Sequence, residues 1–150
     1  MHVDGASNSR GAGAGIVLIS PEGTIHECAM SIDFPATNNE AEYEALIAGL
    51  RLALALGVDE LQVYSDSMLV VNQLNSDYGS GDARMLKYLS HVLELQKGFK
   101  TVHFSHIGRA KNAHADALAA LGSACNELGG TRTITLGEIA LPSFEPGAED

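Results

Sequence analysis

The chain has 150 residues, 45% of them hydrophobic, and a formal net charge of −10 at pH 7. This length and hydrophobic content are typical of a single folded domain with its own core. No apolar run reaches the ~20 residues that a membrane span requires, and no charged-then-apolar leader begins the chain, so we expect an intracellular protein that is not secreted. The two cysteines, Cys28 and Cys125, lie in apolar segments and are expected to be reduced core residues, not a disulfide pair.

Charge is unevenly distributed along the sequence. Between residues 81 and 116 the chain carries six basic residues against three acidic ones, a net charge of +3, whereas the rest has a net charge of −13. The overall acidity argues against a nucleic-acid partner, but a basic strip of this size is compatible with phosphate contacts. The basic residues of the strip are Arg84, Lys87, Lys97, Lys100, Arg109 and Lys111.

The first part of the sequence predicts three antiparallel strands. Residues 2–7 and 24–32 have the composition of strands, and residues 16–20 form another that is entered through the glycine-rich stretch 11–15. Pro21-Glu22-Gly23 is a turn signal between the second strand and the third. Asp4 lies within the first of these strands.

A long amphipathic helix is predicted from Asn39 to about Gly57. Thr37, Asn38 and Asn39 are good capping residues, and Gly57 is a stop signal. The apolar stripe of this helix consists of Ala45, Leu46, Gly49, Leu50, Ala53 and Leu56.

Three glutamates at the start of this helix differ in the direction they are expected to face. Glu42 projects from the apolar stripe, where a carboxylate must be paired, bound to metal or strongly shifted in pKa. The alternative is that Glu42 lies at the rim of the core with its carboxylate in water. Glu40 and Glu44 are expected on a solvated face shared with Arg51, as charges that suit the helix dipole.

The remaining elements predict a mixed sheet with helices packed against it. Strands are expected at residues 61–65 and 101–106, and helices at residues 67–75, 83–96 and 112–128. The helix over residues 83–96 is expected to present Leu86, Leu89, Leu93 and Gln96 along one face. We expect a loop at residues 76–81, an added edge strand at residues 131–136, and a disordered acidic tail at residues 142–150.

Four carboxylates occupy unusual positions: Asp4 within a strand, Glu42 on a core-facing helix stripe, Asp66 at the end of a strand, and Asp116 in an alanine-rich helix. Each has a simpler explanation, because Asp4 could form a turn, Asp66 could cap a helix, and Asp116 could interact with a helix dipole. If the four converge, they cannot all stay ionised without cations, and hard divalent metal ions bound through oxygen are then expected. Two such ions ~3.5–4 Å apart are a known device for attack on a phosphodiester.

Four motifs that occur in this order resemble ribonuclease H type 1. They are Val3-Asp4-Gly5-Ala6-Ser7, Thr37-Asn38-Asn39-Glu40-Ala41-Glu42, Tyr64-Ser65-Asp66-Ser67, and the stretch from His106 through Asn112 to Asp116-Ala117-Leu118-Ala119. More narrowly, the chain is similar to the ribonuclease H domain that follows reverse transcriptase in gypsy-type LTR retrotransposons, particularly those of plants. The resemblance implies an α/β fold, with a five-stranded mixed sheet flanked by helices. It also implies cleavage of the RNA strand of RNA–DNA hybrids by a two-metal-ion mechanism.

The resemblance covers residues 1–128 and leaves residues 129–150 as a C-terminal extension. It implies that Asp4, Glu42, Asp66 and Asp116 bind two Mg²⁺ ions, for which Mn²⁺ can substitute. His106 corresponds to a mobile catalytic histidine in a strand-to-helix loop, whereas His114 is expected on a helix surface. The residues expected to contact nucleic acid are Ser7, Asn8, Thr37, Asn38, Asn39 and Ser67.

Two departures from the family affect substrate binding. The interval of 50 residues from Asp66 to Asp116 is shorter than in bacterial and animal cellular members, which insert a basic handle, and residues 76–81 carry no positive charge. The chain is also strongly acidic. We therefore expect no handle, weak independent binding of the hybrid, and an upstream reverse transcriptase domain as partner, with no membrane association. The expected location is the cytoplasm, the nucleus or a virus-like particle.

The alternative function is that of a non-catalytic domain, which keeps the fold for hybrid binding or protein contact. Degenerate members of the family usually lose carboxylates, whereas this chain has all four. The retained carboxylates therefore favour the enzyme.

Overall fold

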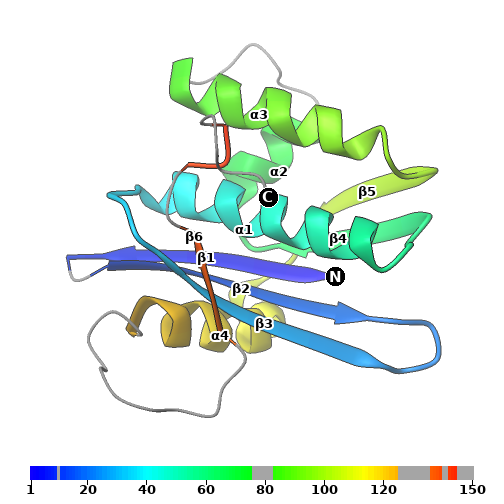
Figure 1. Cartoon of the computed structure of the whole chain (residues 1–150), viewed down its shortest axis with the longest axis horizontal. Coiled ribbons are helices and arrows are strands. Elements are labelled where there is room, and N and C mark those ends of the chain that lie inside the picture. Colours follow the sequence, from blue (N-terminus) through cyan, green and yellow to red (C-terminus); the bar gives the residue numbers. More distant parts are fainter. Residues whose placement is uncertain (10, 76–82, 125–135, 140–141, 145–150) are drawn as a thin grey trace.

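The computed structural model describes residues 1–9, 11–75, 83–124, 136–139 and 142–144 (Figure 1). The strands in these ranges are β1 (His2–Asn8), β2 (Gly11–Ile19), β3 (Ile25–Ile32), β4 (Glu60–Ser65), β5 (Thr101–His106) and β6 (Leu136–Ile139). The helices are α1 (Asn38–Ala55), α2 (Met68–Asn75), α3 (Ala83–Gln96), α4 (Ala113–Ala124) and the short 3₁₀ helix η1 (Arg109–Asn112). No helix in the described ranges is long and apolar enough to cross a membrane.

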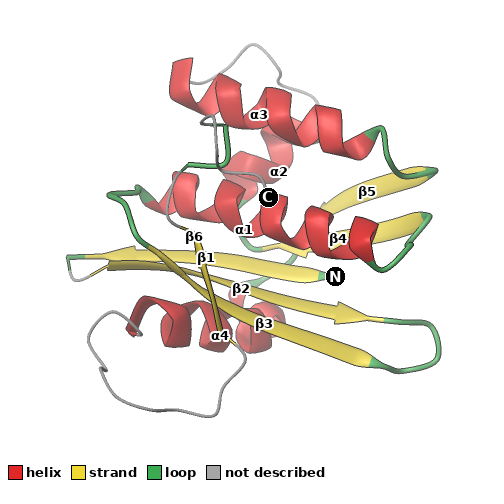
Figure 2. Ribbon diagram, viewed as in Figure 1, coloured by secondary structure: helices red, strands yellow, loops and turns green. Residues whose placement is uncertain are grey.

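The strands form one sheet in the order β5-β4-β1-β2-β3-β6. The first three strands of the chain pair antiparallel, whereas β4 and β5 extend the sheet in parallel from β1. Helices cover both faces, with α4 on one side and α1 to α3 on the other (Figure 2). The predicted α/β fold and its five-stranded mixed sheet are confirmed, and β6 adds a sixth strand parallel to β3 at the edge.

The glycine-rich stretch 11–15 lies inside β2, where it pairs with both neighbouring strands, and is not an entry to a strand that begins at residue 16. The reason is that α4 packs directly on this part of the sheet. A Cβ atom at Gly15 would lie 2.1 Å from the carbonyl oxygen of Ala115, and one at Gly13 would lie 2.2 Å from that of Ala119. The absent side chains therefore allow α4, which carries Asp116, to approach the strands closely.

Helix α1 begins and ends as the sequence predicts, to within two residues. The side chain of Thr37 accepts a hydrogen bond from the N–H of Glu40, and the side chain of Glu40 accepts one from the N–H of Thr37. This capping box satisfies two donors at the helix start. At the other end Gly57 has a φ of +78°, a conformation that glycine adopts without strain.

The expectation that Glu40 and Glu44 are solvated is wrong. Glu40 is 7% exposed and Glu44 is 0% exposed. Glu40 pairs with Arg84 of α3. Glu44 accepts hydrogen bonds from the hydroxyl of Tyr88 at 2.6 Å, from the N–H of Ser143 at 3.0 Å and from the hydroxyl of Ser143. Groups distant in the sequence therefore compensate both buried carboxylates.

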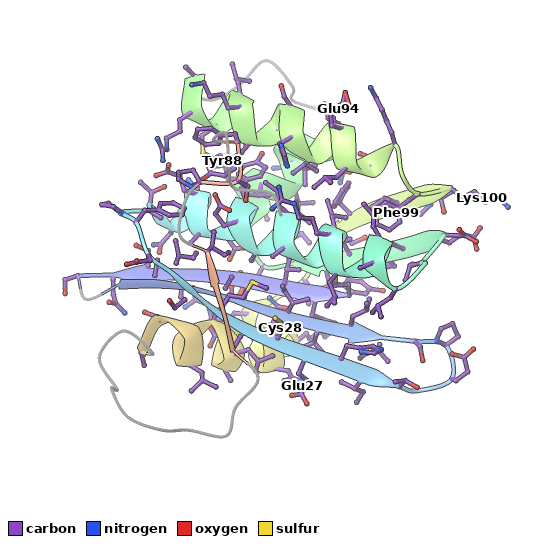
Figure 3. The ribbon with its side chains drawn as sticks, viewed as in Figure 1. Glu27, Cys28, Tyr88, Glu94, Phe99 and Lys100 are labelled. Atoms are coloured by element: carbon purple, nitrogen blue, oxygen red, sulfur yellow. The ribbon has the colours of Figure 1, made fainter. Side chains whose placement is uncertain are left out.

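Helix α3 buries a different stripe from the one predicted. The buried residues of α3 are Met85, Tyr88, Leu89 and Val92, whereas Leu86 and Leu93 are each 36% exposed. Tyr88 extends from α3 toward α1 (Figure 3) and stacks on Tyr43 with ring centroids 5.6 Å apart. The hydroxyl of Tyr43 in turn donates to Gln73 of α2 at 2.6 Å, so these aromatic residues join the three helices on this face.

The described residues after α4 pack on the body of the protein. An edge strand, β6, is present at residues 136–139, whereas the strand was predicted at residues 131–136, of which 131–135 lie outside the described ranges. The expectation of disorder does not hold for residues 142–144, because Ser143 is 5% exposed and the ring of Phe144 meets Tyr88 edge-on at 4.9 Å. Residues 76–82, 125–135 and 145–150, which include Cys125 and the predicted loop, lie outside the described ranges, and Cys28 is half-buried in β3.

Candidate active site

Strand β1 brings the first carboxylate of the site into the core. Asp4 lies in the middle of β1 and is 4% exposed. Gly5 follows it, and a Cβ atom there would lie 2.1 Å from the carbonyl carbon of Ala41 and 2.4 Å from the nitrogen of Glu42. Helix α1 therefore crosses β1 in direct backbone contact. This contact places Glu42 beside Asp4.

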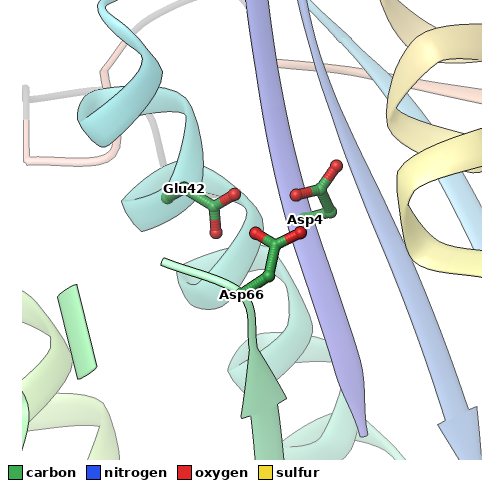
Figure 4. A group of neighbouring side chains, drawn as sticks. All are labelled: Asp4, Glu42 and Asp66. Carbon is green, nitrogen blue, oxygen red and sulfur yellow. The ribbon is translucent and has the colours of Figure 1, made fainter. Parts of the chain in front are cut away.

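Asp4, Glu42 and Asp66 form a cluster of three carboxylates. One oxygen from each lies within 4.8 Å of the other two. They come from three elements, since Asp66 directly follows β4, which runs parallel beside β1. Figure 4 shows the three carboxyl groups directed toward one another. The structure thus brings together three of the four predicted carboxylates.

The carboxylate oxygen atoms of this cluster differ in whether they accept a hydrogen bond. Glu42 Oε1 accepts a hydrogen bond from the N–H of Gly5 at 3.0 Å, and Oε2 accepts one from the hydroxyl of Ser65 at 3.2 Å. In contrast, the buried Oδ2 atom of Asp66 accepts no hydrogen bond among the described residues. Its cationic neighbour is Nε of the exposed residue Arg109, 4.0 Å away. A buried carboxylate oxygen without a donor indicates a position where a cation can bind.

The cluster retains a proton when no cation is present. Burial, together with its contacts with Glu42, Asp66 and Asp116, raises the pKa of Asp4 to about 10. Burial also raises the pKa of Glu42, although hydrogen bonds from Asp4, Gly5 and Ser65 oppose that shift. The ionisation of two close carboxyl groups in a buried site has a high free-energy cost. A bound divalent cation would remove this restriction, so the residues present fit a metal site.

Asp116 and His106 lie at the edge of this cluster. Asp116 is in the first turn of α4 and is exposed, yet it is close enough to hydrogen-bond Asp4. His106 is the last residue of β5, not part of a following loop, and its side chain is exposed. Its backbone pairs with Ser65, the residue that precedes Asp66. His114, as predicted, is a helix-surface residue; it is half exposed and contacts Glu27 at 2.6 Å.

The predicted nucleic-acid contacts lie in two places. At the first, the end of β1 meets the start of α1, since the N–H of Ser7 donates to the side chain of Asn38 at 3.1 Å. Asn8 and Thr37 are exposed there, and Asn39 is half-buried. At the second, Ser67 precedes α2, and its side-chain oxygen accepts from the N–H of Val70 at 3.4 Å. Helix capping therefore accounts for the local role of Thr37 and Ser67. Thr37 is exposed and Ser67 is half-buried, so contact with a ligand is open to Thr37 in full and to Ser67 in part.

Two residues near the cluster were not predicted to have a role. Asn112 is 1% exposed; it donates to the carbonyl of Val3 at 2.9 Å and contacts the ring of His2 at 3.3 Å, which ties the start of α4 to β1. Ser65 is 5% exposed and contacts Glu42. Both residues belong to the motifs that carry the family resemblance, but nothing in their local sequence indicates their partners.

Comparisons with known proteins agree with this fold. A family described as "Reverse transcriptase-like" matches residues 2–122. Ribonuclease HI of Halobacterium salinarum is 39% identical over 120 residues, which cover 79% of this chain and 60% of that protein. A bifunctional protein of Mycobacterium tuberculosis is 40% identical over 84 residues, which cover 56% of this chain and 23% of that protein.

Solved structures show the same relationship. The crystal structure of ribonuclease H1 from Halobacterium salinarum superposes with a TM-score of 0.76 at 39% identity, and the match covers 81% of this chain and 93% of that one. The LC11 ribonuclease H1, solved in complex with an RNA/DNA hybrid, matches with a TM-score of 0.76 at 31% identity, over 85% of this chain and 97% of that one. The foamy viral protease–reverse transcriptase, at 19% identity and a TM-score of 0.65, shares the fold.

The Halobacterium salinarum and LC11 relatives are ribonuclease H enzymes, and this chain shares their fold. The chain spans 60% and 23% of the length of the two curated relatives described above. The match over residues 2–122 covers most of the sequence. This chain therefore belongs to the ribonuclease H-like family that is described as reverse transcriptase-like.

Proposed function

We propose that this protein is a metal-dependent endoribonuclease that cleaves the RNA strand of RNA–DNA hybrids. The observation that carries the proposal is the cluster of Asp4, Glu42 and Asp66, in which one buried oxygen of Asp66 has no donor in the part of the chain that the structure describes and Asp4 has a strongly raised pKa. Such a cluster is unfavourable for folding by itself and is suited to cations. The relatives at 39% and 31% identity are ribonuclease H enzymes, one of them solved with an RNA/DNA hybrid.

In the proposed mechanism, Asp4, Glu42, Asp66 and Asp116 hold two Mg²⁺ ions, with Mn²⁺ as a substitute. When bound, such ions activate water and stabilise the leaving 3′ oxygen of a phosphodiester. The protein supplies orientation: the N–H of Gly5 and the hydroxyl of Ser65 fix both oxygens of Glu42. His106, at the end of β5 beside β4, assists proton transfer or product release.

The hybrid is proposed to contact the polar edge formed by Ser7, Asn8 and residues 37–39. Exposed hydroxyl and amide groups suit recognition of 2′-hydroxyl groups in a shallow minor groove, which is read by shape and not by sequence. This edge lies on the same two elements as the carboxylates, because Ser7 is three residues after Asp4 on β1 and Glu42 is three residues after Asn39 on α1. A hybrid bound there would present its RNA strand to the carboxylate cluster.

We further propose that the domain acts within a gypsy-type retroelement polyprotein, next to a reverse transcriptase domain, inside the cell. The motif pattern supports this context, as does the family description. The net charge of −10 also favours a partner that contributes affinity for the hybrid.

The test is incubation of the purified protein with labelled RNA–DNA hybrid, duplex RNA and duplex DNA, in Mg²⁺ or in chelator. We expect cleavage of the RNA strand of the hybrid, in Mg²⁺ only. Hybrid binding without cleavage in any divalent metal would favour the non-catalytic alternative. Cleavage of duplex DNA would contradict the proposed substrate.

A further inference from the structure

The hydroxyl group of Ser65 contacts one carboxylate of the cluster and the backbone next to another. It donates to Glu42 Oε2 at 3.2 Å and accepts a hydrogen bond from the N–H of Ser67 at 3.1 Å. Ser65 and Ser67 flank Asp66, and the backbone of Ser65 is fixed further by a bond of 2.9 Å from the N–H of Ile107 to its carbonyl. One buried hydroxyl therefore contacts both the side chain of Glu42 and the turn that carries Asp66.

The chemistry of a hydroxyl makes this contact directional. A serine side chain has one hydrogen to donate and two lone pairs to accept. The N–H of Ser67 uses one lone pair, and the hydrogen is directed to Glu42. Because Gly5 holds the other oxygen of Glu42, the carboxylate is held at both ends. Its plane is then fixed before any ligand arrives.

We propose that Ser65 is a positioning residue, which orients Glu42 and the Asp66 turn for cation binding. The inference rests on the metal-dependent activity proposed above. Partners that hydrogen-bond to metal ligands without touching the metal commonly control affinity, because they fix the ligands in the geometry that the ion requires. Removal of the hydroxyl frees one oxygen of Glu42 and one backbone donor of the Asp66 turn at the same time.

The test is titration of the protein with Mn²⁺ and Mg²⁺ by calorimetry, without nucleic acid. We expect Ser65→Ala to raise the dissociation constant by ~10–100-fold, and Ser65→Thr, which keeps the hydroxyl, to restore it to within about threefold. A small enclosed cavity lined by Val3, Glu42, Val63 and Ser65, among others, leaves room near the added methyl group. The matched control is Ser31→Ala, which removes a buried hydroxyl from β3 and should leave the dissociation constant unchanged.

Circular dichroism first establishes that each variant folds. If Ser65→Ala does not fold, Ser65→Cys, which is close in size and a weak donor, takes its place in the titration. Wild-type affinity in Ser65→Ala, or equal weakening in Ser65→Ala and Ser65→Thr, would overturn the inference. Failure of the wild-type protein to cleave the hybrid would contradict the proposed function but leave this comparison of cation affinities intact.

Discussion

At the scale of single residues, Asp66 is the carboxylate whose charge matters most, because its buried Oδ2 atom accepts no described hydrogen bond. Asp66→Asn keeps the shape and removes the charge. We predict that it abolishes cleavage of the hybrid while leaving the fold intact, and that stability without metal does not fall, because carboxylate repulsion is relieved. Hybrid cleavage and thermal melting in chelator measure the two effects. Turnover near that of the wild type would refute the assignment of Asp66.

The raised pKa of Asp4 predicts how stability depends on pH. Its carboxyl group titrates near 3.8 in the unfolded chain and at about 10 in the folded protein, so the folded state binds more protons between these values. Stability without metal should therefore fall as pH rises through this window, by up to about 1.4 kcal/mol per pH unit. Melting in chelator from pH 5 to pH 9 tests this prediction. Asp4→Asn and saturating Mg²⁺ should each flatten the curve, because neither leaves a proton that only the folded state binds at this position.

His106 and His114 provide a matched pair for the proton-transfer role. General acid–base assistance is typically worth ~10²–10⁴-fold, and a histidine that acts on product release contributes less. We predict that His106→Ala slows cleavage but leaves measurable metal-dependent activity. His114→Ala removes only an exposed contact with Glu27 and should change little. Single-turnover and steady-state rates of the two variants would separate an effect on chemistry from one on product release. A larger loss in His114→Ala than in His106→Ala would mean that the wrong histidine has been chosen.

Sequence reasoning identified residues whose environment is local and missed those whose partners are distant. Glu42 stood out because it interrupts the apolar stripe of its own helix. Glu44 lies on the same helix but is buried by Tyr88 and Ser143, which are 44 and 99 positions away. No periodicity within α1 contains that information. The role of Ser65 was missed for the same reason, because its partner Glu42 is 23 positions away.

At the scale of elements, residues 142–144 contact both α1 and α3 and so stabilise the packing of the two helices. Ser143 donates two hydrogen bonds to the buried Glu44. Phe144 packs on Tyr88, and the cationic groups of Arg84 and Lys87 lie over its ring, 5.2 and 5.4 Å from the ring centroid. Since the first turns of α1 also carry Glu42, this segment supports the site from the opposite side of the helix.

We predict that Ser143→Ala lowers the free energy of unfolding by about 1–3 kcal/mol, because a buried charged acceptor loses a donor. For a chain of this size each kcal/mol corresponds to roughly 2–4 °C in Tm. Leu93→Ala, on the exposed face of α3, is the control and should have a smaller effect. Urea unfolding monitored by circular dichroism compares the two. Equal losses of unfolding free energy in Ser143→Ala and Leu93→Ala would mean that the contact of Ser143 with Glu44 contributes no specific stability.

The elements themselves were predicted well, and the packing of their faces was not. Capping signals set the limits of α1, and the expected limits of α3 and β5 match those observed. In α3, however, two apolar stripes overlap at Leu89, and the sequence alone does not favour either. Contact with α1 selects the stripe that contains Tyr88, because that ring stacks on Tyr43.

At the scale of the whole molecule, the basic strip is less available for phosphates than its charge indicates. Arg84 pairs with Glu40, and Lys97 pairs with Glu94 at 3.0 Å. Arg109 is exposed but lies near Asp66. With a chain of net charge −10, long-range attraction to a nucleic acid should be poor.

We therefore predict that residues 1–150 alone cleave hybrids weakly and lose more than about tenfold in activity between 50 and 200 mM salt, since each phosphate contact adds to the salt dependence. Fusion to an upstream reverse transcriptase domain should strengthen binding by ~10²–10⁴-fold, because the second contact becomes intramolecular. Fluorescence anisotropy across a salt series measures both quantities. Tight, salt-insensitive binding by the isolated chain would contradict this account.

The burial of Glu44 beneath Ser143 also has a consequence for synthesis on the ribosome. Helix α1 emerges early, but two of the three described donors to its buried carboxylate belong to a residue that is translated 99 positions later. Until that residue has left the exit tunnel, the carboxylate of Glu44 has only the hydroxyl of Tyr88 among these donors, or that face of α1 stays hydrated. Native packing around α1 is therefore complete only after Ser143 has emerged, and the earliest helix of the domain is among the last to reach its final environment.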